Sequence, residues 1–277
     1  HFDYNLLVIG GGSAGLVSAY IAAAVKAKVA LIEKHKMGGD CLNTGCVPSK
    51  ALIRSAKAAD TLRHANRYGL ESVPVKGSFK NIMNRVKDVI AKVEPHDSPE
   101  RYRKLGVDCI AGEASFVSPW ELEVRHNDGR TERLTARSIV VATGGKPAVP
   151  PIPGLKDMEP LTSDNLWELQ EQPERLLVLG GGPIGSELAH AFARLGSKVT
   201  QVEMGERLLA KEDEDVSELV LKQFQADGVD VRLKHAAAEF RMEEGEKVAY
   251  CEHEGERVRI PFDQVLVAVG RAANTAG

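Results

Sequence analysis

The sequence has 277 residues, of which 43% are hydrophobic and 27% are charged, as in ordinary globular proteins. Its length predicts about two domains of roughly 150 residues each. The formal net charge is -3, and no run of lysine and arginine is long enough to form a polyanion-binding face. Aromatic residues make up only 5%, without the aromatic and basic pattern that stacks bases. Nucleic acid is therefore not expected as a partner.

The sequence also argues against membrane insertion and secretion. The longest apolar stretch, 19–25, is far shorter than a membrane span, and no signal peptide precedes the first strand. Four cysteines are too few for a secreted disulfide scaffold. We therefore expect a cytoplasmic protein, in which a close cysteine pair is more often catalytic than structural. The chain begins with His1 rather than Met, which suggests an origin in a longer protein.

The chain opens with a strand, a glycine turn, a helix, a second strand and an acid. These features are predicted at 5–9, 10–15, 16–25, 28–32 and Glu33. The first strand is a continuous apolar run, as expected for a parallel strand buried on both faces. This order of elements is typical of a dinucleotide-binding domain.

The three glycines of the fingerprint have different physical roles. Gly10 permits the tight turn, Gly12 lets the backbone approach a pyrophosphate, and Gly15 allows helix and strand to pack closely. The phosphates then lie at the positive N-terminus of the helix. Glu33 is placed to accept hydrogen bonds from ribose hydroxyls.

A second set of the same features follows in the C-terminal half. The strand 175–179 runs into Gly180, Gly182 and Gly185, and a later strand ends at Glu203. The offset from Gly180 to Glu203 equals that from Gly10 to Glu33, so the chain should bind two dinucleotides. An acid at position 203 suits free ribose hydroxyls and repels a 2′-phosphate, which favours NADH over NADPH. Arg207 is near enough to leave NADPH open.

Cys41 and Cys46 admit three interpretations: core residues, half of a metal site, or a redox disulfide. Structural zinc normally needs four ligands, and His35 is the only other candidate nearby, so no metal site is predicted. The polar and glycine residues around the cysteines argue against a core role. Residues five apart on a helix have Cα atoms about 8.7 Å apart, whereas a disulfide tolerates about 7 Å. A bridge would therefore need a break in the helix, which Gly45 can supply.

The helix should restart just after this break. Pro48 suits a first helical turn, and a helix entrance stabilises a thiolate. The position is therefore suitable for reversible reduction.

The run GDCLNTGCVPSK, from Gly39 to Lys50, resembles the active-site signature of the class I flavoprotein disulfide reductases. Lipoamide dehydrogenase, glutathione reductase and mercuric reductase belong to this family, many of whose members carry a small residue or threonine where Asp40 stands. The resemblance implies that Cys46 is the charge-transfer thiolate beside a flavin and that Cys41 is the interchange thiol that attacks the external substrate. It also implies FAD and a nicotinamide dinucleotide as cofactors.

The resemblance extends to residues outside the signature. Lys50 is expected near flavin N5, with Glu187 as its ion-pair partner across the domain interface. Pro183 stands where glutathione reductase-like members have an aromatic gate, which indicates the mercuric reductase-like branch. The predicted FAD-binding residues are Gly10, Gly12, Ser13, Ala14, Gly15, Glu33, Lys34, Gly39, Asp40, Glu113, Ala114, Ala142, Thr143 and Gly144. The predicted NAD-binding residues are Gly180, Gly182, Pro183, Ile184, Gly185, Glu203, Met204 and Gly270.

We predict an α/β fold with two Rossmann-like, doubly wound, three-layer domains, the second inserted into the first. Four prolines in 147–153 predict a stiff linker, so the FAD-binding domain is placed at 1–149 and the NAD-binding domain at 150–277. Members of the family continue into a segment that completes the flavin site and a dimerisation domain. We expect these to be absent from the chain and the full-length protein to be a homodimer. Further helices are predicted at 55–67, 81–93 and 213–226, and further strands at 106–110, 112–117, 121–124, 138–145, 229–233, 248–251, 258–262 and from Gln264.

The function predicted from these features is that of an oxidoreductase. A hydride passes from NADH to FAD, electrons continue to Cys41 and Cys46, and a small-molecule or small-protein disulfide, or a metal ion, is reduced last. Two alternatives stay open. In one, the flavin reduces quinones or oxygen without the thiols. In the other, the chain is an inactive nucleotide-binding fragment.

Overall fold

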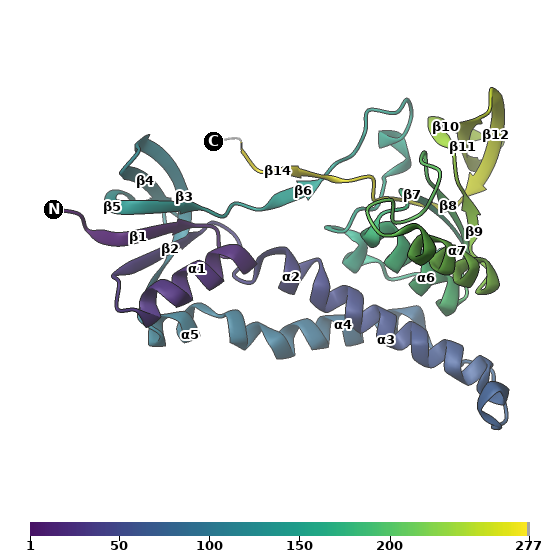
Figure 1. Cartoon of the computed structure of the whole chain (residues 1–277), viewed down its shortest axis with the longest axis horizontal. Helices are drawn as coiled ribbons and strands as arrows, with labels where there is room; N and C mark the ends of the chain where they lie inside the picture. The colour runs from purple at the N-terminus through teal and green to yellow at the C-terminus, as the bar shows by residue number, and fades with distance from the viewer. Residues whose placement is uncertain (276–277) are drawn as a thin grey trace. The chain divides into compact units, whose positions relative to one another are not determined.

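The computed structural model describes residues 1–275, which form two compact units (Figure 1). The first unit comprises His1–Pro48, Lys87–Lys146 and the described residues from Ala273 onward. The second comprises Ser49–Val86 and Pro147–Ala272. Residues 49–86 thus group with the second unit although they precede the predicted domain boundary. The assignment of one nucleotide to each domain remains a prediction.

The first unit is built on a parallel sheet. Strand β1 pairs in parallel with β2 and β5, and β2 pairs in parallel with β3. The distal halves of β3 and β5 pair antiparallel with β4, which closes the five strands into a barrel. The elements of this unit are β1 (Tyr4–Ile9), α1 (Ser13–Ala24), β2 (Val29–Glu33), α2 (Gly39–Asn43), α5 (Pro99–Lys104), β3 (Val107–Ser118), β4 (Glu121–His126) and β5 (Thr131–Val141).

The alternation of side chains along β1 explains its continuous apolar sequence. Val8 packs with Leu16 of α1 on one face of the sheet, and Leu7 packs with Leu122 of β4 on the other. Both faces are therefore buried, as expected for a central parallel strand. The helix, the parallel sheet and the antiparallel strands make three layers.

The two strands predicted at 106–110 and 112–117 are a single strand, β3. Its first half pairs with β2 up to Ala111, and its second half pairs with β4 from Gly112. Gly112 lies where the pairing partner changes, and a Cβ there would lie 2.6 Å from the carbonyl oxygen of Arg125. The glycine marks a close approach of two backbones rather than a break.

The second unit repeats this plan. Its parallel sheet has the order β13-β7-β8-β9, and a separate antiparallel sheet, β10-β11-β12, packs on one face through Leu177, Leu179, Phe240 and Phe262. The predicted α/β class with two three-layer folds is therefore confirmed. The elements of the second unit are β7 (Arg175–Leu179), α6 (Pro183–Leu195), β8 (Lys198–Val202), α7 (Glu214–Ala226), β9 (Asp230–Arg232), β10 (Ala236–Glu243), β11 (Glu246–His253), β12 (Glu256–Phe262) and β13 (Gln264–Val267). Helices α3 (Cys46–Arg63) and α4 (Phe79–Val93) have residues in both units, since the first unit includes residues up to Pro48 and from Lys87. Short strands β6 (Gly145–Pro147) and β14 (Arg271–Ala273) lie where the chain passes between the units.

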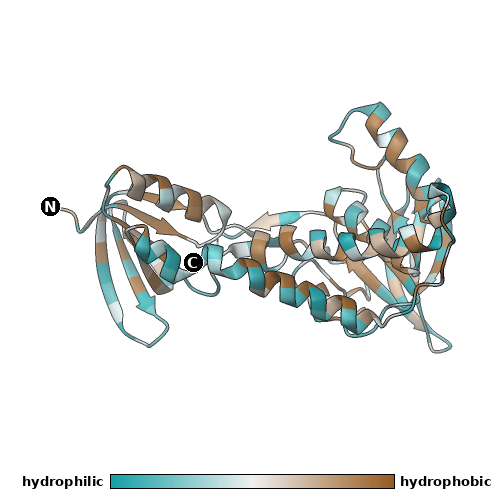
Figure 2. Ribbon diagram, turned by 90° about the horizontal axis from the view of Figure 1, so that it is seen from below, coloured by the Kyte–Doolittle hydropathy of each residue, from teal (hydrophilic) through white to brown (hydrophobic). Residues whose placement is uncertain are grey.

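Two helical segments before residue 87 pack within this second unit. The Arg63 guanidinium, at the end of α3, donates hydrogen bonds to the carbonyl oxygens of Arg194 and Leu195 at the end of α6. A cation at a helix C-terminus is favourable because it opposes the negative end of the helix dipole. Helix α4 is amphipathic and buries Phe79 against Phe192 of α6, with ring centroids 5.8 Å apart. Figure 2 shows such hydrophobic residues recurring along one side of the long helices.

Candidate functional site

The two glycine turns have nearly the same geometry. Gly10 and Gly180 have φ angles of +107° and +108°. A Cβ on Gly10 would lie 2.2 Å from the carbonyl oxygen of Ala142, and one on Gly180 would lie 2.4 Å from that of Ala268. Glycine is therefore required at both positions, because the turn is left-handed and touches the end of a neighbouring strand.

The third glycine of each fingerprint packs against the first. A Cβ on Gly15 would lie 1.8 Å from the carbonyl oxygen of Gly10, and one on Gly185 would lie 2.3 Å from that of Gly180. These contacts agree with the close packing of helix and strand that the sequence predicts for Gly15 and Gly185.

Each predicted ribose-binding acid holds its glycine turn through two backbone amides. Glu33 accepts hydrogen bonds from Gly11 N at 2.7 Å and from His35 N at 2.6 Å. Glu203 accepts them from Gly181 N at 2.6 Å and from Gly205 N at 2.6 Å. We call this arrangement of one carboxylate and two amides the acid clamp. Each carboxylate oxygen retains a second lone pair with which it can accept a hydrogen bond from a ribose hydroxyl.

Gly11 and Gly181 were not among the predicted site residues. A Cβ on Gly11 would lie 2.9 Å from the sulfur of Met37, and one on Gly181 would lie 2.8 Å from Cδ2 of Leu208. Each middle glycine is thus enclosed between the acid and an apolar side chain. The signal in the sequence was the run of three glycines, with the acid 22 residues after the middle one in both copies.

The turns also fit the phosphates of a dinucleotide. Helices α1 and α6 begin after Gly12 and Gly182, and neither helix start has a side-chain cap, so its first amides are available to an anion. A Cβ on Gly182 would meet nothing within 4 Å, whereas the Cα of Gly39 lies 3.6 Å from the Cβ position of Gly12. The start of α2 therefore lies against Gly12 of the first turn, and no atom lies as close to Gly182 of the second turn.

Two further groups of predicted FAD residues lie in the first unit. Glu113 is ion-paired with Lys34 at 3.3 Å and with Arg125 at 2.7 Å. The hydrogen bond from Lys34, followed by that from Arg125, holds the pKa of the Glu113 carboxyl below its usual value. Ala114 follows on β3 and pairs with Val124 of β4.

The second group, Ala142, Thr143 and Gly144, contacts the end of the described chain. The Thr143 hydroxyl donates to the carbonyl oxygen of Asn274 at 2.7 Å, and the Asn274 amide side chain donates to the Thr143 carbonyl oxygen at 3.0 Å. Asn274 N donates to Gly144 O at 3.0 Å. Asn274 was not predicted, and its place shows the chain returning to the first unit.

The backbone around the two cysteines breaks where the sequence predicts. Helix α2 ends at Asn43 and α3 begins at Cys46, so Thr44 and Gly45 separate the two helices. A Cβ on Gly45 would lie 2.9 Å from the carbonyl oxygen of Asp40, which makes glycine necessary at this turn.

The break brings the two thiols into contact. A hydrogen bond with Cys46 is the largest of the causes that raise the pKa of Cys41; burial adds to it, and a hydrogen bond with the Ser13 hydroxyl opposes it. Neither cysteine is in a disulfide; Cys46 is exposed, and Cys41 is partly exposed. Ser13 is the first residue of α1, so the pair also adjoins the first glycine turn.

The other two cysteines pack into the hydrophobic cores of the two units. Cys251 is fully buried in the core of the second unit, and burial raises its pKa to about 11. Cys109 lies on β3, where burial also raises the pKa of the thiol.

Lys50 and Glu187 form the predicted contact, but within one compact unit rather than across an interface. The ammonium nitrogen lies 2.6 Å and 2.8 Å from the two carboxylate oxygens. Both residues belong to the second unit, so the contact lies within one unit. The side chains are 60% and 39% exposed, and exposed pairs of this kind contribute about 0.2–1 kcal/mol. The pair is therefore a weak contributor to stability.

The other predicted NAD residues lie in the second glycine turn or follow the ends of neighbouring strands. Pro183 is the first residue of α6, and Ile184 follows it, 37% exposed. Met204 is 73% exposed beside Glu203. Gly270 has a φ of +146° with nothing within 4 Å of a Cβ. Arg207 donates to the carbonyl oxygen of Ala210 at 3.0 Å and lies 3.8 Å from Glu214, so its guanidinium is held on its own loop.

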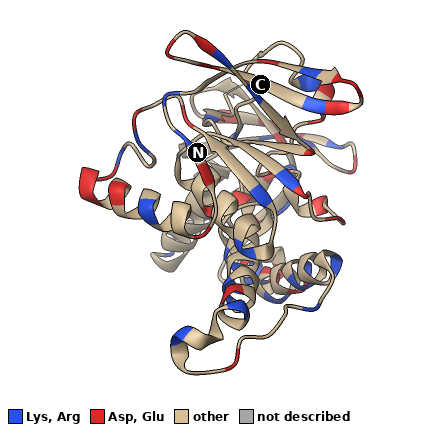
Figure 3. Ribbon diagram, turned by 90° about the vertical axis from the view of Figure 1, so that its right-hand side faces the viewer, with Lys and Arg blue, Asp and Glu red and all other residues tan. Residues whose placement is uncertain are grey.

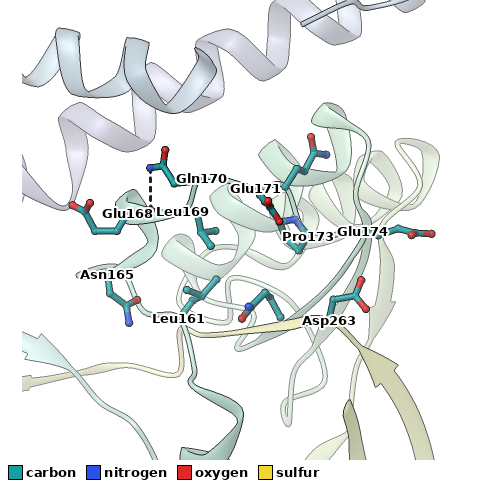
Figure 4. A pocket seen from close by; sticks show the side chains of 11 residues that line it. Leu161, Asn165, Glu168, Leu169, Gln170, Glu171, Pro173, Glu174 and Asp263 are labelled. Carbon is teal, nitrogen blue, oxygen red and sulfur yellow. Dashed lines mark hydrogen bonds between the residues drawn. The ribbon is translucent and has the colours of Figure 1, made fainter. Parts of the chain in front are cut away.

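The second unit has a hollow that contains none of the predicted site residues. It has a volume of about 600 Å³ and is lined by Leu161, Asn165, residues 168–174, Asp263 and Gln264 (Figure 4). Its charged lining residues are Glu168, Glu171, Glu174 and Asp263.

The described residues show no group of three or more side chains that could hold a metal ion. Over the same residues, no helix has the length and apolar character needed to cross a membrane. Basic and acidic residues are interspersed along the chain (Figure 3).

Comparisons with known proteins agree with this geometry. The family model described as "Pyridine nucleotide-disulphide oxidoreductase" matches residues 4–277. A mercuric reductase of Bacillus cereus is 34% identical over 272 residues, which are 98% of this chain and 42% of the relative. A dihydrolipoyl dehydrogenase of Acholeplasma laidlawii is 34% identical over 280 residues, which are 99% of this chain and 80% of the relative.

A solved structure supports the same assignment. The Cu(II) complex of the HOCl-induced flavoprotein disulfide reductase RclA from Escherichia coli matches with a TM-score of 0.82 and 30% identity. The match covers 98% of this chain and 57% of that one. The chain spans about half the length of the mercuric reductases that it matches, at 42% and 49%. It belongs to the pyridine nucleotide-disulphide oxidoreductase family, a family of FAD-binding flavoproteins.

Proposed function

We propose that the chain is the FAD- and NAD-binding part of a flavoprotein disulfide reductase that uses Cys41 and Cys46 as its redox pair. The observation that carries this proposal is the contact of the two thiols at the break between α2 and α3. Ser13, at the start of α1, hydrogen-bonds to one of these thiols. The cysteines and the first glycine turn therefore form one site.

The residues of the first unit have distinct proposed tasks. The amides at the start of α1 bind the phosphates of FAD, and Glu33 accepts hydrogen bonds from its ribose while the acid clamp holds the turn rigid. When bound, FAD would supply two-electron chemistry between a reduced nicotinamide and the disulfide. Cys46, the more exposed thiol at the entrance of α3, is proposed as the thiolate beside the flavin, and Cys41 as the thiol that attacks the acceptor.

The second unit is proposed to bind NADH in preference to NADPH. Glu203 accepts two backbone hydrogen bonds and places a carboxylate next to the expected ribose, which disfavours a 2′-phosphate. A candidate partner for such a phosphate, Arg207, donates one hydrogen bond to the carbonyl oxygen of Ala210 and lies near Glu214. Lys50 and Glu187 are proposed to act at the flavin, since a cation there stabilises an anionic reduced ring.

The acceptor and the assembly are proposed from the family. The acceptor would be a small-molecule or small-protein disulfide, or a metal ion, and relatives named mercuric reductase support the second choice. The full-length protein is proposed to be a cytoplasmic homodimer.

Cysteine alkylation tests the proposed redox pair. In oxidised protein supplied with FAD, Cys41 and Cys46 should resist iodoacetamide, and anaerobic NADH should make both reactive. A Cys109→Ser control should behave in the same way. If both cysteines are alkylated equally before and after NADH, the two sulfurs do not form the redox pair.

A further inference from the structure

A buried polar pair, Gln201 and Ser186, contacts the second glycine turn. Gln201 lies fully buried on β8, and Ser186 lies on α6 with 4% of its surface exposed. The amide nitrogen of Gln201 donates to the carbonyl oxygen of Gly180 at 3.0 Å and to the Ser186 hydroxyl at 3.2 Å. Ser186 in turn donates to the carbonyl oxygen of Gly181 at 3.2 Å. The pair thus holds two consecutive carbonyl groups of the turn.

Gln201 and Glu203 hold the two ends of one peptide group. The carbonyl of Gly180 and the amide of Gly181 belong to the same planar unit. Gln201 donates to its oxygen, and Glu203 accepts from its nitrogen at 2.6 Å through the acid clamp. A carbonyl oxygen can only accept, so the nitrogen of the Gln201 amide must face it. The peptide group therefore cannot rotate without breaking a hydrogen bond at either end.

Ser186 acts on the next peptide group. That group joins the carbonyl of Gly181 to the amide of Gly182. Its oxygen accepts from the Ser186 hydroxyl and from Leu209 N, the latter at 2.8 Å. Because the group is planar, holding its oxygen also sets the direction of the Gly182 N–H. This amide lies directly before α6, where the phosphates of a dinucleotide are proposed to bind.

The first glycine turn has no such pair. Counted from the first glycine of each turn, Leu16 corresponds to Ser186 and Leu31 to Gln201. Strand pairing supports this correspondence, since Leu31 and Gln201 each lie opposite the valine two residues before that glycine. Both leucines are buried in an apolar core and cannot donate a hydrogen bond. The polar pair is therefore a specific feature of the second turn.

The pair also leaves one buried atom unpartnered. Among residues 1–275, the Oε1 atom of Gln201 has no hydrogen-bond partner, and the side chain is fully buried. An unpaired buried acceptor costs free energy that a leucine at this position would not. Since a leucine occupies the corresponding position of the first unit, the fold itself does not require the glutamine. The requirement comes from the turn that it holds.

We propose that Gln201 and Ser186 are positioning residues, which orient the second glycine turn toward the pyrophosphate of the nicotinamide dinucleotide. This inference rests on the proposed NADH site and extends it to two side chains behind the turn. Pro183 has no N–H, whereas Ser13, at the same place in the first turn, has one. The second turn thus offers one amide fewer to the phosphates, and the direction of the Gly182 N–H matters more there.

Fluorescence titration of wild-type protein and Gln201→Leu with NADH tests the proposal. The variant copies the residue of the first unit and should bind NADH roughly three- to tenfold more weakly, the contribution of one well-oriented hydrogen bond. ADP-ribose, which has the pyrophosphate but no nicotinamide, should lose the same factor in competition. The melting temperature should stay within about 4 °C of wild type, because leucine removes the unpartnered oxygen together with the donor bonds.

The outcomes distinguish this inference from the function on which it rests. If wild-type protein binds NADH and Gln201→Leu binds it equally well, only the positioning role is overturned. The same holds if the variant loses affinity for NADH but not for ADP-ribose. If wild-type protein binds no NADH, the proposed function is overturned together with this inference.

Two further variants separate positioning from stability. Ser197→Ala removes a buried hydroxyl that donates to the carbonyl oxygen of Pro173 at 2.7 Å, at the other end of β8 from the turn. It should lower the melting temperature without changing NADH affinity. Ser186→Ala should weaken NADH binding less than Gln201→Leu does, because Leu209 N also holds the Gly181 carbonyl.

The double variant of Gln201→Leu and Ser186→Ala tests whether the two side chains act together. It should lose less affinity than the product of the two single losses, because both residues belong to one hydrogen-bond network. Independent, multiplicative losses, no loss in Ser186→Ala, or an equal loss in Ser197→Ala would overturn the proposal.

Discussion

The acid clamp predicts that Glu203→Gln destabilises the second unit as well as weakening nucleotide binding. The carboxylate accepts from Gly181 N and Gly205 N, both at 2.6 Å. A glutamine side chain has one oxygen, so it can keep only one of these bonds and turns an NH₂ group toward the other amide. Losing a hydrogen bond to a charged group costs about 1.5–3 kcal/mol. For a chain of this size, that corresponds to a melting temperature lower by roughly 3–12 °C.

Thermal unfolding of the nucleotide-free protein measures this effect, since it separates the clamp from ribose binding. Glu206→Gln is a matched control, because Glu206 is 82% exposed and forms a surface ion pair with Lys234. Glu33→Gln should be destabilised by a similar amount, since Glu33 accepts from Gly11 N and His35 N at nearly the same distances. The reasoning is refuted if Glu203→Gln melts at the same temperature as Glu206→Gln.

Three further predictions follow from the site geometry. Gly10→Ala should prevent stable folding, because its Cβ would lie 2.2 Å from the carbonyl oxygen of Ala142. The control is Gly69→Ala, whose Cβ meets nothing within 4 Å. Denaturant titration of this control should show only the strain of a positive φ, a loss of about 1–2 kcal/mol in the free energy of unfolding. Lys50→Met should change the free energy of unfolding by less than about 1 kcal/mol, because the ion pair is exposed. It should nevertheless slow NADH oxidation by FAD-loaded protein. Unchanged turnover would show that Lys50 does not act at the flavin. Cys46→Ala should lower the pKa of Cys41, since the hydrogen bond with Cys46 is the main cause that raises it. Alkylation of Cys41 at pH 8 should then be faster than in reduced wild-type protein. A slower reaction would contradict the role given to the hydrogen bond with Cys46.

Much of the site could be predicted because short-range chemistry determines it. The positive φ of Gly10 and Gly180, and the break at Gly45, follow from local backbone requirements that only glycine meets. The equal offsets from glycine to acid identified Glu33 and Glu203 in the same way.

What could not be predicted depends on contacts between distant segments. Gly112 resembles a strand break, but it is a point where β3 changes partners, which only the pairing with β4 reveals. The alanine-rich start of β10 favours a helix, and pairing with β11 overrides that propensity. The contact of Asn274 with Thr143 joins residues 131 positions apart, and no local pattern announces it.

The visible absorption spectrum of FAD-loaded protein, before and after anaerobic NADH, tests the central claim most directly. The account predicts a flavin band that gives way to a long-wavelength charge-transfer band on reduction, and loss of that band in Cys46→Ala. A flavin that only bleaches in the wild-type protein, or a protein that stays colourless after incubation with FAD, would contradict it.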